Sequence, residues 1–159
     1  MIKIKTYPKR IYDYNVTNQK HGPNDSFISI GYTFPLNDAD YGQDLPVIPK
    51  SGRYILLNFD DVLEDVELPT LGGGENVKCH KITSEQASGI VKFALATPDD
   101  TIIHIHCQAG QSRSVGVGEA LFQIFKTAGR EVDLTHTKVV ISPNQTVFKS
   151  VLDAYEAQL

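Results

Sequence analysis

The residues best suited to chemistry lie in one short stretch, residues 106–114, which reads HCQAGQSRS. Its cysteine and arginine are separated by five residues, a spacing that can close a loop with both side chains facing one centre. Such a loop turns its successive backbone N–H groups inward and forms an anion-binding nest. Gly110 can adopt the positive φ that a sharp turn needs, and Arg113 can bind two phosphate oxygens with its planar guanidinium. The stretch therefore predicts a site for a phosphate group.

Cys107 is the candidate nucleophile of this site. It follows an apolar, β-branched run over 101–105, typical of a buried strand, and precedes a helix-like run over 115–126. The N-terminus of that helix would add free N–H groups and the positive end of its dipole to the same centre. Together with the arginine they favour a thiolate over a thiol, whereas an inert cysteine lies in apolar surroundings. We therefore expect attack of sulfur on phosphorus through a covalent phosphocysteine intermediate.

The string HCQAGQSRS resembles the signature of the cysteine-based protein tyrosine and dual-specificity phosphatases, and most of all their compact dual-specificity-like members in bacteria and phages. The resemblance implies one catalytic domain over 1–159, of class α/β, with a central mostly parallel or mixed sheet flanked by helices. Its phosphate-binding loop would lie between a strand and a helix, and no cofactor or metal is implied. The residues expected to bind phosphate are Gln108, Ala109, Gly110, Gln111, Ser112 and Arg113.

A phosphatase also needs a group that protonates the leaving oxygen and later activates water, and a positioned carboxylic acid does both. In the family resembled, this acid is an aspartate on a loop after a core strand upstream of the cysteine. Here residues 54–59 read as that buried strand, and Asp60 and Asp61 follow it. We choose Asp61 because it lies further into the loop, with Asp60 in reserve. Both can instead be solvated turn residues.

The segment after these aspartates departs from the pattern of the compact family members. The interval between Asp61 and Cys107 is longer, and the excess lies in an irregular excursion over 64–81 that contains glycines at 72–74. Glycine runs confer flexibility, so we expect a mobile excursion here, and Asp65 becomes a third candidate for the acid. The tryptophan-containing acid loop of the larger tyrosine-specific enzymes is absent, because the chain has no tryptophan.

Three further residues have a functional and a structural interpretation. Ser114 can donate to the sulfur of Cys107 and help it leave, or it can cap the following helix. His106 tunes the loop through hydrogen bonding, or is a core histidine with an ordinary partner. Asn144 is explained fully by the start of the last helix. A zinc site is a further interpretation, but the residues that could ligate zinc lack the spacing of such a site. These residues are Cys79, His80, His104, His106 and Cys107.

The composition indicates a folded protein with no electrostatic preference for nucleic acid or membranes. The chain has 159 residues, 41% hydrophobic and 21% charged, with a net charge of −4, so no basic excess attracts polyanions. Its two cysteines cannot form a disulfide framework, and a thiolate nucleophile needs a reducing compartment. The first residues lack the apolar core of a signal peptide, and no apolar run approaches a membrane span. We expect a cytoplasmic enzyme that acts on phosphorylated proteins or peptides, with no nucleic-acid or membrane partner.

The remaining segments predict alternating strands and helices. Helices are expected over 83–96 behind a Thr83 capping box, over 115–126 with a stop at Gly129, and from Ser142, as the cap, to the C-terminus. Residues 31–52 are expected to be a loop, and residues 131–141 a linker with room for one short helix. Strands are expected at 1–5 (a short edge strand), 11–16, 26–30, 54–59 and 102–106.

Other functions use the same residues. A binding module could hold phosphorylated ligands without turnover, although such a module has no need of the Cys107 thiol. Phosphatases of this fold also act on RNA 5′-phosphates or phosphoinositides, which the acidic balance of the chain disfavours. Sulfur or arsenate chemistry on a similar cysteine loop fits less well, because Gly110 and the Arg113-Ser114 pair match the phosphatase pattern.

Overall fold

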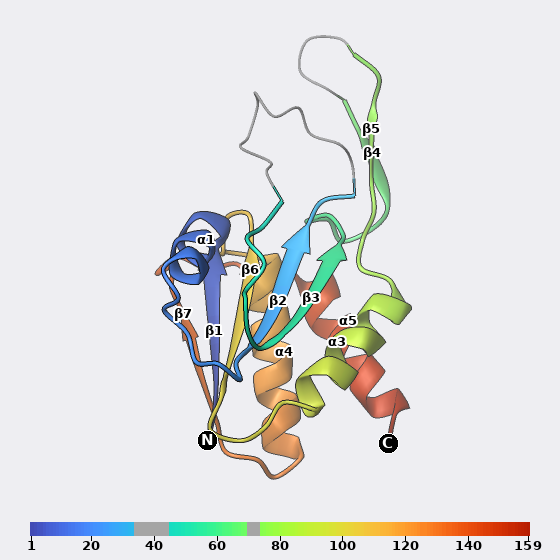
Figure 1. Cartoon of the computed structure of the whole chain (residues 1–159). Helices are drawn as coiled ribbons and strands as arrows, with labels where there is room; N and C mark the ends of the chain where they lie inside the picture. The colour runs from blue at the N-terminus through green and yellow to red at the C-terminus, as the bar shows by residue number, and fades with distance from the viewer. Residues whose placement is uncertain (34–44, 70–73) are drawn as a thin grey trace.

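A five-stranded parallel sheet forms the centre of the molecule (Figure 1). The structure is a computed structural model, and it describes residues 1–33, 45–69 and 74–159. The strand order is β3-β2-β6-β1-β7, and each pair of neighbouring strands runs parallel. The strands of this sheet are β1 (Ile2–Pro8), β2 (Ser26–Gly31), β3 (Arg53–Asn58), β6 (Ile102–Cys107) and β7 (Val132–His136).

Helices of the described chain cover both faces of this sheet (Figure 1). On one face lies α1 (Lys9–Thr17), whose Tyr12 and Val16 pack with Phe27 of β2. Helices on both faces are usual for a parallel sheet, and the expected α/β class with a central, mostly parallel or mixed sheet flanked by helices is confirmed. The helices of the opposite face are α3 (Ser84–Leu95), α4 (Arg113–Thr127) and α5 (Gln145–Ala157).

The middle strand, β6, carries Cys107 at its carboxyl end. Its side chains alternate, so that Ile103 and Ile105 enter the core shared with α3, α4 and α5. His104 and His106 point to the α1 side, where they stack on Phe27 and Tyr12. Ligands of α/β proteins bind outside the carboxyl ends of parallel strands. The turn between β6 and α4 therefore lies where a protein of this class binds its ligand.

The N-terminal segment differs from the prediction in two places. The strand predicted at 1–5 is β1, but it is internal, since β6 pairs with one side of it and β7 with the other. The strand predicted at 11–16 is wrong, because this segment forms helix α1. Its buried residues Tyr12 and Val16 are four positions apart and share one helix face. Packing of that face against the sheet outweighs the strand preference of isoleucine and tyrosine.

Three other segments also differ from the prediction, whereas the strand predicted at 26–30 is confirmed as β2. The strand predicted at 54–59 exists, but as the partly exposed edge strand β3. The linker predicted over 131–141 contains β7 at the opposite edge. The excursion over 64–81 forms an antiparallel hairpin of β4 (Val66–Leu68) and β5 (Val77–Cys79). Residues 70–73 of this excursion, and residues 34–44 of the loop predicted over 31–52, lie outside the described residues.

The predicted helix ends are right in two cases and wrong in one. Thr83 caps α3 in a capping box, and Gly129 adopts a φ of +76° just after α4. The cap of α5 is Asn144 rather than Ser142, because the Asn144 side chain accepts a hydrogen bond from the N–H of Val147 at 3.0 Å. This hydrogen bond fixes the orientation of the Asn144 side chain at the start of α5.

Candidate active site

The turn between β6 and α4 brings Cys107 and Ser114 into contact. Cys107 is the last residue of β6, and its side chain is buried. Its Sγ lies 3.2 Å from the hydroxyl oxygen of Ser114, which is fully buried in the first turn of α4. This hydroxyl can donate to the sulfur. Ser114 is not the cap of α4, because the N-cap position belongs to Ser112.

Three backbone carbonyls of the loop over residues 107–113 accept hydrogen bonds from segments outside the loop. The carbonyl oxygen of Gln108 accepts from the N–H of Lys9, and those of Gln111 and Ser112 accept from the segment 142–144, at 2.8–3.2 Å. Within the described part of the chain, the N–H groups of residues 109–112 donate to no protein acceptor. The loop is thus held from outside through its carbonyls, and its N–H groups are available for another acceptor.

Gly110 adopts the positive φ that the sequence predicted for the turn of this loop, with a value of +70°. A Cβ atom built on it would lie 2.4 Å from the backbone N of Pro8 and 2.6 Å from the carbonyl carbon of Tyr7. The end of β1 therefore approaches the loop so closely that only glycine fits. Together with the bond from Lys9, this contact seats the loop on the junction of β1 and α1.

Arg113 is held by contacts from the ends of two other strands. Its side chain is buried, and its Nη1 donates to the carbonyl oxygens of Gly31 at 3.0 Å and Phe59 at 2.8 Å. Its guanidinium lies 4.2 Å from the ring centre of Tyr32, which follows β2. Burial raises the pKa of Tyr32, while the charge of Arg113 opposes this shift. Sequence reasoning missed all three contacts. Two of them use backbone carbonyls, which every residue has, and the third uses Tyr32, which belongs to no recognisable motif.

Asp61 is the aspartate that contacts the 107–113 loop. Its Oδ1 accepts a hydrogen bond from the hydroxyl of Ser112 at 2.7 Å and another from Nδ2 of Asn144 at 2.9 Å. The Asp61 side chain is exposed, at the carboxyl end of the sheet where Cys107 also lies. Asp61 is therefore tied to the loop that carries Cys107 and Arg113 at its two ends, and a carboxyl group beside such a loop could assist proton transfer.

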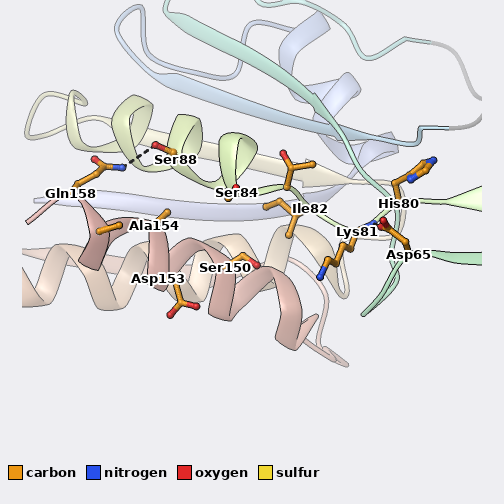
Figure 2. Close-up of a pocket in the computed structure, with 12 residues that line it drawn as sticks. Asp65, His80, Lys81, Ile82, Ser84, Ser88, Ser150, Asp153, Ala154 and Gln158 are labelled. Carbon is orange, nitrogen blue, oxygen red and sulfur yellow. Dashed lines mark hydrogen bonds between the residues drawn. The ribbon is translucent and has the colours of Figure 1, made fainter.

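The other two candidate aspartates have structural surroundings. Asp60 is buried and accepts hydrogen bonds from the backbone N–H and the hydroxyl of Thr33 and from the N–H of His80. Asp65 accepts from the N–H of Lys81 at 3.0 Å. It lines a groove of about 810 Å³ between α3 and α5 (Figure 2), whose lining does not include Cys107 or Arg113. Neither aspartate reaches the loop in this structure.

Asn144 has a larger structural role than the sequence indicated. Besides capping α5, its Nδ2 donates to Oδ1 of Asp61 and, at 3.3 Å, to the carbonyl oxygen of Val62. Next to it, the Thr146 hydroxyl donates to the carbonyl oxygen of Leu63 at 2.9 Å. The first turn of α5 therefore holds the whole segment 61–63. The helix-start signal at 142–145 marked this position without indicating the contact.

His106 lies beneath the loop rather than in it. Its ring is buried and stacks on Tyr12 with centroids 4.0 Å apart, and its Nε2 is 2.7 Å from the Ser29 hydroxyl. Burial lowers the pKa of His106 to about 4, so the ring is neutral near pH 7. These contacts are those of a core histidine at the end of β6.

The second histidine of β6 belongs to a separate buried chain of hydrogen bonds. His104 Nε2 lies 2.8 Å from Oδ2 of Asp25, and its Nδ1 lies 3.0 Å from the hydroxyl oxygen of Tyr7. Burial alone would raise the pKa of Asp25, but hydrogen bonds from His104 and from two backbone N–H groups give a net lowering. His104 and His106 thus have different partners, and they do not share a ligand position.

Comparisons with protein-family models, curated proteins and solved structures find no match for this chain. No helix in the described ranges combines the length and apolar character needed to cross a membrane. Across the same ranges, no group of three or more histidine, cysteine or acidic side chains is arranged to hold a metal ion.

Proposed function

We propose that this chain is a cysteine-dependent phosphomonoesterase of the tyrosine or dual-specificity phosphatase type, acting on phosphorylated proteins or peptides. One observation carries the proposal. Cys107 begins a short loop and Arg113 ends it, and Ser112 of the same loop is hydrogen-bonded to Asp61. A nucleophile and a fixed cation on one loop, with a carboxyl group bonded to that loop, are the groups that phosphoryl transfer needs. The resemblance of HCQAGQSRS to that family's signature supports the same conclusion.

In the first step, the Cys107 sulfur attacks phosphorus, a P–S bond forms, and the P–O bond to the leaving group breaks. Asp61 donates a proton to the leaving oxygen, so that an alcohol or phenol departs rather than its anion. The guanidinium of Arg113 and the N–H groups of residues 108–112 bind the phosphoryl oxygens. These donors are fixed before the substrate arrives, which strengthens their effect in the transition state.

In the second step, Asp61 accepts a proton from water, the water oxygen attacks phosphorus, and the P–S bond breaks. The Ser114 hydroxyl, 3.2 Å from the sulfur, donates to the departing thiolate. Inorganic phosphate leaves and Cys107 returns to its starting state. Because the thiol must stay reduced through this cycle, we expect the protein to act in a reducing compartment such as the cytoplasm.

The test is hydrolysis of p-nitrophenyl phosphate between pH 4 and 8 by the wild type, Cys107→Ser and Asp61→Asn. We expect no turnover by Cys107→Ser, and a strongly reduced and flattened pH profile for Asp61→Asn. Cys79→Ala is the matched control, because Cys79 is also buried but lies in the β4–β5 hairpin. Equal activity in Cys107→Ser and the wild type would refute the proposal. An inactive wild type that still binds phosphate, measured by calorimetry, would make the chain a phosphate-binding module instead.

Substrate class is tested on the same protein with four phosphate esters. These are a phosphotyrosine peptide, a phosphoserine peptide, a 5′-phosphorylated RNA and a phosphoinositide. We expect the peptides to have the highest kcat/KM, because the net charge of −4 repels polyanions. Faster turnover of the RNA or the lipid would assign the site to that class and refute the peptide assignment.

A further inference from the structure

We propose that Ser112 is a positioning residue that determines which oxygen of Asp61 carries the transferred proton. This inference rests on the proposed function, since it concerns the acid of the same reaction. The Ser112 hydroxyl donates to Oδ1 of Asp61 at 2.7 Å, and Nδ2 of Asn144 donates to the same oxygen at 2.9 Å. Both donors come from outside the segment that carries the aspartate, and they approach a single oxygen.

Two donors on one oxygen decide where the proton of the acid resides. A protonated carboxyl group has one O–H oxygen and one carbonyl oxygen, and the carbonyl oxygen is the better acceptor of two hydrogen bonds. Oδ1 of Asp61 is therefore the carbonyl oxygen, and the proton resides on Oδ2. In the described part of the chain, Oδ2 has no protein partner, which leaves it available to a leaving oxygen or a water molecule.

The orientation of the Ser112 hydroxyl is unusual for its position. Ser112 is the N-cap residue of α4, where a serine side chain normally accepts a hydrogen bond from an N–H of its own helix. Here the side chain forms no such cap and donates to Asp61 instead. The orientation of the Ser112 side chain thus has two effects. It fixes the acid, and it leaves the first N–H groups of α4 to an anion in the loop.

Ser112 also sets the position of the acid relative to the loop itself. Its carbonyl oxygen accepts from the N–H groups of Asn144 and Gly116, at 3.1 and 2.9 Å, so its backbone is fixed on both sides. Asp61 is therefore bonded to Ser112, which lies in the loop directly before Arg113 and after the residues whose N–H groups are proposed to bind phosphate. Asn144 is a poorer probe of this link, because it also caps α5 and bonds to Val62.

The experiment compares Ser112→Ala and Ser112→Thr on two aryl phosphates. The leaving group of 2,4-dinitrophenyl phosphate departs without protonation, whereas that of phenyl phosphate needs the acid. We expect Ser112→Ala to lower kcat/KM for phenyl phosphate about 10-fold, which is less than the ~10²- to 10⁴-fold that a general acid supplies, and to lower it much less for the dinitrophenyl ester. Ser112→Thr keeps a hydroxyl and restores the phenyl phosphate rate. Ser88→Ala is the matched control, because it removes a partly exposed hydroxyl bonded to Gln158, far from the loop.

A double-mutant cycle separates positioning from general structural damage. In the Asp61→Asn background, Ser112→Ala should cause no further loss, because the group through which it acts is already absent. Losses that multiply in the double mutant, or an equal loss on both esters, would overturn the role of Ser112. A wild type without Cys107-dependent turnover would overturn the proposed function instead. The two failures therefore give different results in one set of assays.

Discussion

Substitution of Gly110 by alanine tests the seating of the 107–113 loop on β1. Gly110 has a φ of +70°, and its added Cβ would lie 2.4 Å from the Pro8 nitrogen, 2.6 Å from the Tyr7 carbonyl carbon and 2.9 Å from Cδ of Pro8. These atoms belong to the backbone or to a closed ring, so none can move aside like the end of a flexible side chain. Gly129 provides the control, since it has a similar φ of +76°, but among the described residues no atom beyond its chain neighbours lies within 4 Å of the Cβ it would gain.

Both variants place an alanine in a left-handed backbone conformation, but only Gly110→Ala also overpacks the site. A left-handed conformation costs an alanine about 1–2 kcal/mol in either place. Overpacking against fixed atoms adds roughly 1–3 kcal/mol at Gly110 alone. We therefore expect the free energy of unfolding to fall by about 2–5 kcal/mol in Gly110→Ala, and by about 1–2 kcal/mol in Gly129→Ala.

Urea unfolding followed by circular dichroism measures both values, and p-nitrophenyl phosphate turnover below the unfolding transition measures the effect on the site. Gly110→Ala should lose turnover even while it is folded, because the loop must move away from Pro8. Gly129→Ala should keep turnover, since it lies beyond the far end of α4. Equal losses of stability in the two variants would refute the close approach of loop and strand.

Three further predictions concern single side chains. Folding lowers the pKa of His106 from 6.5 to about 4. As the pH falls, the unfolded chain therefore binds the proton before the folded chain does. The contribution of neutral His106 to the free energy of unfolding is complete above about pH 6.5 and falls by up to ~3 kcal/mol as the pH drops to 4. His106→Gln should flatten this part of the curve of unfolding free energy against pH. Asp60→Asn should lower the free energy of unfolding by about 1–3 kcal/mol, because it replaces a buried acceptor of three hydrogen bonds. Asp61 is exposed, so Asp61→Asn should change the free energy of unfolding by no more than ~0.5 kcal/mol and instead lower turnover. Asn144→Ala should cost about 1–2 kcal/mol as a lost helix cap, and its kcat/KM should fall more for phenyl phosphate than for 2,4-dinitrophenyl phosphate.

The parts of the fold that sequence predicts correctly are those with strong local signals. The apolar run before Cys107, the capping box at Thr83 and the glycine stop at Gly129 each depend on residues close in sequence. The errors fall on short segments whose state is decided by distant partners. Residues 11–16 form a helix because Tyr12 and Val16 bury against Phe27, and residues 132–136 form a strand because β1 offers them an edge.

The same distinction applies to the site. Gly110 could be predicted to have a positive φ, because a loop of this length has to turn sharply and glycine turns most easily. Sequence distinguishes Asp60 from Asp61 only by position in the loop, because the two side chains have the same chemistry and differ in the direction in which they point. The carbonyls of Gly31 and Phe59 that hold Arg113 leave no trace in the sequence, because every residue has a carbonyl.

The loop that carries Cys107 is held by segments from the whole length of the chain. The N–H of Lys9, at the start of α1, donates to this loop, and the carbonyls of Gly31 and Phe59 accept from its arginine. Asn144, at the start of α5, donates both to the loop and to Asp61. Such contacts form late in folding, because distant segments must meet first. A nascent chain on the ribosome would therefore carry Cys107 before Asn144 is in place to hold Asp61. Under the proposed function, the thiol is present during synthesis before the chain can turn over a phosphate ester, which it can do only once the last helix has docked.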